Sequence, residues 1–343
     1  MIAVTMRFRQ EFRLRAAIGI LTAASLAMPV DSATAAGTVA IGGKITEYAG
    51  VTGGVLRSIA PGPDGNIWFV EDSRDTIGRI TPAGKVTEFA IPMPPRRSSA
   101  QPFGIAPGPD GNLWFTEGAR GRIGRIAPSG TITEFFLPNG SSQPTAIVAG
   151  PDRSLWFTEN AANKIGRMTL TGATTEFTIP SAHAFPFSIA AGRDGNLWFT
   201  EYGVGKIGRI TPSGTFAEFA VPTRAGHPFG IAAGADGNLW FTENSADKIG
   251  RITPSGAITE FSISTPNAGP LGIAAGADGN VWFTEGSLSN PAHKIGRITP
   301  AGLITEYPLP TAAAQPFAIT GAPDGKIWFT ENRKDANRIG LLQ

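Results

Sequence analysis

The stretch HPFGIAAGADGNLWFTENSADKIGRITPSGAITEFSIS, residues 227–264, contains the pattern that decides the fold. It holds four short runs rich in apolar and β-branched residues, as half-buried strands require. Asp236-Gly237 separates the first two runs and Pro254-Ser255-Gly256 the last two, and glycine there supplies the positive φ of a tight turn. We expect strands at 229–233, 238–243, 248–253 and 257–263.

This unit occurs seven times, once for each tryptophan of the chain. Every tryptophan is followed by Phe and then by Thr-Glu or, once, Val-Glu. The tryptophans are Trp68, Trp114, Trp156, Trp198, Trp240, Trp282 and Trp328. Four antiparallel strands repeated at a period of about 42 residues predict an all-β, seven-bladed β-propeller. A β-solenoid would instead stack shorter rungs in parallel.

The two ends of the chain predict how the ring closes. The last repeat stops after its third strand, at Gln343, so its fourth strand is missing. Near the other end, Gly43-Lys44-Ile45-Thr46-Glu47-Tyr48 matches the fourth strand of the sixth repeat, 302–307. We therefore expect the N-terminal strand to complete the last blade, within a single propeller domain at 41–343.

Residues 1–36 have the features of a secretory signal peptide. A basic segment with four arginines precedes an apolar run at 16–30, which is short for a membrane span, and Ala33-Thr34-Ala35 is a small-residue cleavage site. The alternative is a short membrane anchor. The signal predicts a secreted or periplasmic protein that has no membrane association after cleavage.

Composition narrows the possible partners and chemistries. The signal segment carries four of the 29 basic and two of the 27 acidic residues, so the remainder of the chain has balanced charge. A balanced chain gives no electrostatic footprint for nucleic acid. Because the chain has no cysteine, it has no disulfide, thiolate nucleophile or cysteine-ligated zinc. We expect a monomer.

Connections on one face of the propeller are the candidate binding region. The Asp-Gly and Ser-Gly turns on the other face are short and nearly uniform, whereas extra residues occur at 92–102, 285–294 and 333–336. One of these longer connections carries Arg96-Arg97. We therefore expect a small molecule or peptide to bind on this face, at the mouth of the central channel.

A ring of mainly aromatic residues is expected at that mouth. It consists of the second residue of each inner strand: Arg57, Phe103, Thr145, Phe187, Phe229, Leu271 and Phe317. These side chains form either an apolar cup for a hydrophobic ligand or a filler between blades, since a position repeated in every blade also suits the core.

Acidic and histidine side chains are the candidates for chemistry. A glutamate follows each Trp-Phe-Thr/Val, and the seven are Glu71, Glu117, Glu159, Glu201, Glu243, Glu285 and Glu331. They could bind a hard cation, or pair with third-strand cations. The possible cations are Lys164, Lys206, Lys248 and Lys294. The histidines are His183, His227 and His293, of which His227 precedes an inner strand and is the candidate base.

The repeat resembles the virginiamycin B lyase family, also called streptogramin lyases. The resemblance rests on Asp-Gly-Asn-Leu-Trp-Phe-Thr-Glu, on Asn-Lys-Ile-Gly-Arg at 163–167 and on Ile-Thr-Glu-Phe at 258–261, and it covers residues 44–343. It implies a seven-bladed propeller that opens cyclic streptogramin B depsipeptides by Mg²⁺-dependent elimination at the ester linkage, with a histidine base and acidic metal ligands in the last two blades.

The positions that carry this chemistry in the family differ here. The family's histidines follow the proline of the inner strand, where this chain has Leu271 and Phe317, and the acidic residue two positions before the second histidine is Gln315. Glu331 matches the remaining metal carboxylate. A leucine or phenylalanine cannot accept a proton, and a neutral glutamine weakens a Mg²⁺ site.

Three functions remain open from the sequence. The first is a lyase-like enzyme with His227 as a replacement base and Glu285 and Glu331 as ligands to Mg²⁺. The second is a non-catalytic extracytoplasmic binding propeller that holds a peptide, glycan or partner protein with the aromatic mouth and the Arg96-Arg97 loop. The candidate binding residues at the mouth are Arg57, Phe103, Phe229, Leu271, Gln315 and Phe317. The third is a lactonase-type hydrolase, which needs a convergent cluster of Glu, Asn and Asp metal ligands.

Overall fold

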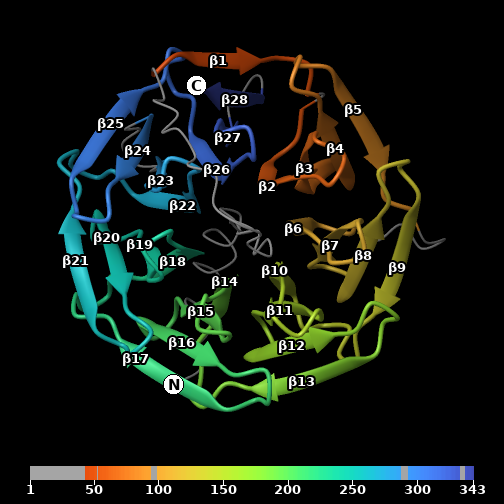
Figure 1. Ribbon diagram of the computed structural model, residues 1–343. Helices are drawn as coiled ribbons and strands as arrows, with labels where there is room; N and C mark the ends of the chain where they lie inside the picture. Colours follow the sequence, from red (N-terminus) through yellow and green to blue (C-terminus); the bar gives the residue numbers. More distant parts are fainter. Residues whose placement is uncertain (1–42, 52, 94–98, 287–292, 333–336) are drawn as a thin grey trace, which may run out of the picture.

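In the part of the chain that the computed structural model describes, twenty-eight strands form seven four-stranded antiparallel sheets around a central axis (Figure 1). The structure describes residues 43–51, 53–93, 99–286, 293–332 and 337–343. The predicted signal peptide at 1–36 and the Arg96-Arg97 pair lie outside these residues. The predicted seven-bladed propeller with four antiparallel strands per blade is confirmed.

Each blade runs outward from an inner strand. The first blade contains β2 (Leu56–Pro61), β3 (Ile67–Glu71), β4 (Thr76–Ile80) and β5 (Val86–Ala90), with the short helix η1 (Asp72–Arg74). The second contains β6 (Pro102–Pro107), β7 (Leu113–Glu117), β8 (Arg122–Ile126) and β9 (Ile132–Phe136). The third contains β10 (Pro144–Ala149), β11 (Leu155–Glu159), β12 (Lys164–Met168) and β13 (Thr174–Thr178).

The remaining blades follow the same plan. The fourth contains β14 (Pro186–Ala191), β15 (Leu197–Glu201), β16 (Lys206–Ile210) and β17 (Phe216–Ala220). The fifth contains β18 (Pro228–Ala233), β19 (Leu239–Glu243), β20 (Lys248–Ile252) and β21 (Ile258–Ser262). The sixth contains β22 (Pro270–Ala275), β23 (Val281–Glu285), β24 (Lys294–Ile298) and β25 (Ile304–Pro308). The seventh contains β26 (Pro316–Gly321), β27 (Ile327–Glu331), β28 (Arg338–Leu342) and β1 (Ile45–Tyr48).

The N-terminal strand closes the seventh blade, as predicted. β1 pairs antiparallel with β28, placing Ile45 opposite Leu342 and Tyr48 opposite Ile339. Glu47 of β1 accepts a hydrogen bond from the backbone N–H of Thr311 at 3.1 Å. This strand therefore supplies the sheet edge that the C-terminal end of the chain lacks.

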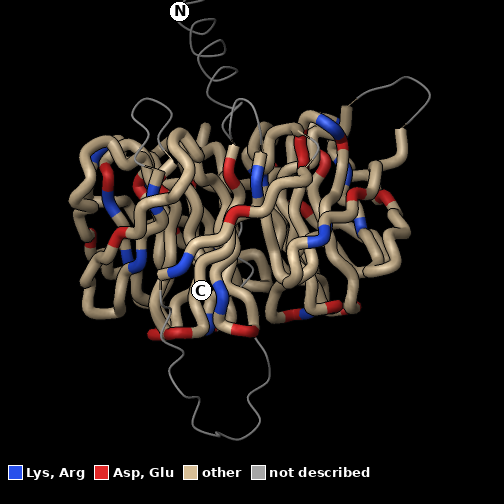
Figure 2. The backbone as a smooth tube through the Cα atoms, turned by 90° about the horizontal axis from the view of Figure 1, so that it is seen from above, with Lys and Arg blue, Asp and Glu red and all other residues tan. Residues whose placement is uncertain are grey.

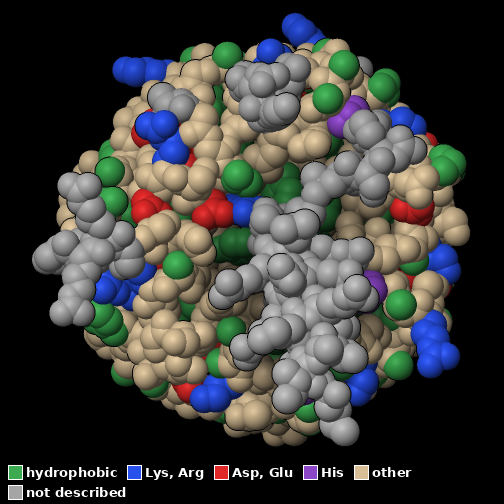
Figure 3. Space-filling view, turned by 180° about the vertical axis from the view of Figure 1, so that it is seen from behind, with side chains coloured by type: hydrophobic (Ala, Val, Ile, Leu, Met, Phe, Trp, Pro, Cys, Tyr) green, Lys and Arg blue, Asp and Glu red, His purple; other side chains and the backbone are tan. Residues whose placement is uncertain are grey.

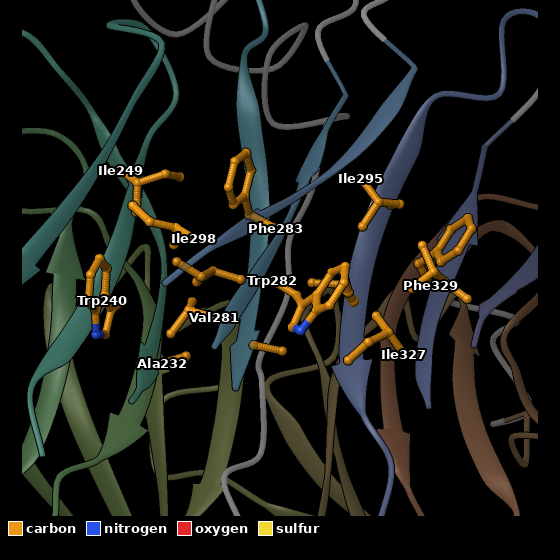
Figure 4. Close-up of a cluster of buried hydrophobic side chains, with 14 of the residues drawn as sticks. Ala232, Trp240, Ile249, Val281, Trp282, Phe283, Ile295, Ile298, Ile327 and Phe329 are labelled. Atoms are coloured by element: carbon orange, nitrogen blue, oxygen red, sulfur yellow. The ribbon is translucent and has the colours of Figure 1, made fainter. Parts of the chain in front are cut away.

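The hydrophobic core lies between neighbouring blades. Adjacent residues of a second strand point to opposite faces of the sheet, so Trp282 and Phe283 enter different inter-blade layers. Figure 4 shows Trp240 of the fifth blade beside Val281 of the sixth, and Trp282 directed toward Ile327 of the seventh. Each blade consequently covers the apolar faces of both neighbours, and a closed ring leaves none of these faces without a neighbour.

Most repeated motifs have a structural function within this core. Arg251 lies over Trp240 and Phe261, with its guanidinium carbon 5.6 and 5.5 Å from the ring centroids, and the two rings are stacked. The indole N–H of Trp240 donates to Asp236 at 3.2 Å. A Cβ at Gly250 would lie 2.1 Å from the ring of Phe241, so a side chain does not fit there. The residues that define the repeat therefore hold each blade together.

The molecule is a disc with two distinct faces. Figure 2 shows the disc from its edge, with acidic residues at the tips of the turns on one side. Gly237 and Gly256 have φ of 81° and 95°, which confirms the predicted turn geometry. Within the described residues, the structure contains no helix that is both long and apolar enough to traverse a bilayer.

Candidate functional site

A β-bulge at the start of every inner strand directs one side chain toward the channel. In the fifth blade, Pro228 is opposite Glu243 and Ile231 is opposite Phe241, so two residues of β18 face one residue of β19. The extra residue bends the strand and changes the direction of its side chains. The same register shift occurs in all seven blades. It gives the second residue of each inner strand a common position at the mouth.

The predicted mouth residues lie together in the structure. Phe229, Leu271 and Phe317 are 3–4% exposed and belong to one cluster, against which Phe103 and Phe187 pack. The centroids of Phe187 and Phe229 are 4.7 Å apart, and those of Phe103 and Phe187, which come from the second and fourth blades, are 6.2 Å apart. Figure 3 shows hydrophobic side chains at the centre of this face.

Two residues at this mouth were missed by the sequence reasoning. Tyr202 contacts Phe187 and Phe229, with centroid distances of 5.9 and 6.2 Å, and Asp72 pairs with Arg57. Both directly follow the glutamate that ends the second strand of every blade, at a position where three other blades have asparagine. Asn332 shows the ordinary function of that position, because it bonds both backbone groups of Leu56 in the next blade. Asp72 and Tyr202 differ from the asparagine of the repeat, and this difference is the signal in the sequence that could have identified them.

Arg57 is the one cation of the mouth ring. Its Nε and Nη2 donate to the same carboxylate oxygen of Asp72, at 2.8 and 2.6 Å. Its guanidinium carbon lies 5.6 Å from the ring centroid of Phe103 and 6.0 Å from that of Phe317. The ring is therefore apolar except at the first blade, where it contains a neutralised ion pair, and at the third, where it contains the hydroxyl of Thr145.

His227 lies at the edge of the aromatic cluster. Its ring stacks on Tyr202 at a centroid distance of 4.9 Å, and its Nδ1 is 3.0 Å from the hydroxyl of Ser245. His293 has a different role, because its Nδ1 accepts a hydrogen bond from the backbone N–H of Gln315 at 3.2 Å. Burial lowers the pKa of His293. His227 thus places an imidazole near the mouth. The two positions at which the family has histidine are occupied here by Leu271 and Phe317.

The glutamate ring does not pair as expected with third-strand lysines. Lys206 lies opposite Glu201 in register, yet its ammonium group contacts Glu218 of the fourth strand at 3.0 Å. The corresponding pairs are Lys164–Glu176, Lys248–Glu260 and Lys294–Glu306. The expected pairing was wrong because the lysine head groups stay near solvent, whereas the ring carboxyls are fully buried.

Burial changes the acid strength of this ring. Glu201, Glu243 and Glu285 are buried, and each lies near the fourth-strand glutamate of its own blade. Desolvation, followed by repulsion from that neighbour, raises the pKa of each to about 8. A carboxyl group that keeps its proton near neutral pH is a poor ligand for a hard cation, which binds the deprotonated form.

Glu285 and Glu331, the residues expected to bind Mg²⁺, are not grouped with other metal-ligating side chains in the part of the chain that the structure describes. Glu285 and Glu331 occupy equivalent positions in neighbouring blades and are buried. Among the described residues, no group of three or more histidine, cysteine, aspartate and glutamate side chains could hold a metal. His227, Glu285 and Glu331 are therefore not brought together as a three-residue metal group.

These features define a seven-bladed propeller with an aromatic site at the channel mouth. Comparison with known proteins then identifies its family. The Virginiamycin B lyase family model matches residues 16–234 and 141–343. The chain belongs to the virginiamycin B lyase family.

Solved structures of the family are close to this one. Virginiamycin B lyase from Staphylococcus aureus is 41% identical, with a TM-score of 0.81 over 88% of this chain and 99% of that one. Its catalytically inactive variant, in which alanine replaces a histidine, was solved with quinupristin and is 40% identical, with a TM-score of 0.80 and coverages of 88% and 99%. A streptogramin B lyase structure is 36% identical, with a TM-score of 0.79 over 88% and 98%. A search of curated proteins gives no match.

Proposed function

We propose that this chain is a non-catalytic ligand-binding propeller of the virginiamycin B lyase family. The observation that carries the proposal is the pair Leu271 and Phe317. These residues replace the family's histidines and are buried with Phe229 in one apolar cluster. Neither side chain can accept a proton, so the base that elimination needs is absent from the family positions.

The same substitutions that remove the base suit binding. Aromatic side chains bury large apolar areas and supply much of the free energy of association at binding sites. Phe187 contacts both Phe103 and Phe229 at the mouth, and Tyr202 extends this surface. Such a surface suits an apolar small molecule or peptide. We further propose that the protein acts outside the cytoplasm, after removal of residues 1–36.

Lyase activity is the second candidate function, and the position of His227 favours it. Its imidazole stacks on Tyr202 beside the aromatic cluster, where a bound cyclic depsipeptide would lie. The described residues offer no metal group to accompany it. A His227-dependent reaction would therefore be proton abstraction without the family's Mg²⁺ contribution, which makes it the weaker of the two proposals.

One incubation separates the candidates. The purified chain is incubated with quinupristin and Mg²⁺, and the Staphylococcus aureus enzyme serves as the positive control. Elimination leaves the mass unchanged, so ring opening is read by chromatography and fragmentation mass spectrometry. We expect no ring opening and saturable binding by calorimetry. Ring opening that disappears in His227→Ala would refute the binding proposal and establish the lyase.

A further inference from the structure

Arg57 contains a buried hydrogen-bond donor that no described residue satisfies. Its side chain is 5% exposed, and Nε and Nη2 are both used by Asp72. The remaining nitrogen, Nη1, is buried and has no hydrogen-bond partner among the described residues. Leaving such a donor without an acceptor costs about 1–3 kcal/mol, so an acceptor from outside the described structure is expected at this point.

Other arginines of the propeller show which acceptor suits this arrangement. Arg79 lies over Trp68 and Phe89, as Arg57 lies over Phe103 and Phe317. The Nη1 of Arg79 donates to a backbone carbonyl oxygen of the next blade, at 2.9 Å. In the described part of the chain, three of the six arginines that lie over a tryptophan make this contact, and the pairs are Arg79–Pro128, Arg209–Pro254 and Arg251–Pro300. Arg57 also lies over two aromatic rings, but its Nη1 has no such carbonyl oxygen among the described residues.

The charge at the mouth restricts the missing acceptor. Asp72 already neutralises Arg57 through two hydrogen bonds to one oxygen. A ligand carboxylate would have to share the guanidinium with that carboxylate, and the mouth ring has no second cation. A carbonyl oxygen of an amide or ester needs only the free N–H donors. The aromatic rings beside the guanidinium suit an apolar group attached to that carbonyl.

We propose that Nη1 of Arg57 recognises the carbonyl oxygen of an uncharged, apolar amide or ester held at the channel mouth, with its apolar group against Phe103 and Phe317. This inference rests on the proposed binding function and adds the class of ligand to it. Arg57 is then a specificity residue, because it distinguishes ligands with an acyl oxygen from hydrocarbons of the same shape.

Three small probes test the inference by NMR titration. N-acetyl-phenylalanine methylamide carries the apolar group and carbonyls, N-acetyl-phenylalanine adds a carboxylate, and ethylbenzene has no acceptor. Arg57→Met combined with Asp72→Asn removes the donor without leaving a buried charge. Arg79→Met is the matched control, because it removes an equivalent arginine in the same blade, away from the mouth. Melting temperatures verify that each variant is folded.

We expect the methylamide to bind more tightly than the other two probes. In the double variant its affinity should fall roughly tenfold, the size of one hydrogen bond to a charged donor, while ethylbenzene binding and the Arg79→Met control stay unchanged. Ethylbenzene binding without any preference for the methylamide would overturn the assignment of Arg57 alone. Tightest binding of the carboxylate would also overturn it. Binding of no probe would overturn the proposed function as well.

Discussion

The hydroxyl of Thr242 donates a hydrogen bond to the backbone carbonyl of Leu271, across the boundary between the fifth and sixth blades, at 2.8 Å. The same hydroxyl accepts from the backbone N–H of Gly230 at 2.9 Å, inside the β-bulge of its own blade. Thr200 and Thr284 make the equivalent inter-blade bonds to Phe229 and Phe317. These threonines therefore fix the backbone of the mouth residues to the preceding blade.

Removing one such hydroxyl should destabilise the propeller and loosen the mouth. Thr242→Val keeps the shape of the side chain but leaves a buried N–H and a buried carbonyl without a partner. We expect a loss of about 1–3 kcal/mol in the free energy of unfolding, measured by urea denaturation. Thr259→Val is the control, because Thr259 is exposed on β21. Equal effects of the two substitutions would contradict the role assigned to Thr242.

The glycine of the Ile-Gly-Arg motif should tolerate no side chain. A Cβ at Gly250 would lie 2.1 Å from the Phe241 ring, which is fully buried between blades. Gly250→Ala should therefore lower the melting temperature by several degrees, because overpacking typically costs about 1–3 kcal/mol. Gly140→Ala is the matched control, since an added Cβ meets nothing within 4 Å. Partial recovery in Gly250→Ala with Phe241→Leu would confirm the ring as the obstacle.

The sequence predicted the architecture because the repeat encodes it redundantly. The strands expected at 229–233 and 248–253 differ by one residue from β18 and β20, and the closure by β1 followed from a missing fourth strand. A propeller buries its core between equivalent surfaces, so a pattern seen seven times specifies both sides of every interface. Periodicity alone was sufficient for this part of the structure.

The site was harder to predict, because contacts between side chains depend on distances that the period of the repeat does not give. The mouth ring could be placed by counting residues from each inner proline. Asp72 and Tyr202 could not, since they occupy a position where most blades have asparagine or glycine. The lysine pairing was wrong for a similar reason. Lys248 has Glu243 directly opposite and Glu260 on the other side, and only burial decides that it contacts Glu260.

Stability should decrease as the pH rises from mildly acidic to basic. Burial, together with Glu218, raises the pKa of Glu201 from 4.5 to about 8. Between these values the folded chain holds a proton that the unfolded chain has lost, so the free energy of unfolding falls with rising pH. The contribution is complete below 4.5 and lost above about 8. Melting temperatures measured across this interval should decline, and Glu201→Gln should reduce the decline.

The neighbouring glutamate provides the control for this pH effect. Burial alone would raise the pKa of Glu218, but its bonds to Lys206 and Ser181 outweigh burial and lower it. The contribution of Glu218 to the free energy of unfolding is present above the ordinary glutamate pKa. It is lost only as the pH falls below that pKa. Glu218→Gln should therefore lower stability at neutral pH. It should reduce the decline toward basic pH only in part, because it removes the repulsion that raises the pKa of Glu201 but leaves burial, the larger cause, in place. A decline unaffected by Glu201→Gln would show that other groups cause it.

Restoring the family's residues should produce lyase activity if, as we propose, Leu271 and Phe317 prevent it. Leu271→His and Phe317→His place imidazoles in the buried mouth, where desolvation favours the neutral form that can accept a proton. Gln315→Glu adds a carboxylate to support a Mg²⁺ site. We expect the triple variant to open quinupristin in the presence of Mg²⁺, where the parent chain does not.

The control for restored activity uses the same ring. Phe103→His with Phe229→His introduces two imidazoles at equivalent positions of other blades, so general effects of added histidine are matched. Chromatography of the reaction should show ring-opened product only for the triple variant. Activity in both would mean that any imidazole at the mouth suffices. Inactivity of a folded triple variant that still binds quinupristin would show that Leu271 and Phe317 do not by themselves explain the missing chemistry. Within the described residues, the unformed metal group would then be the remaining physical difference.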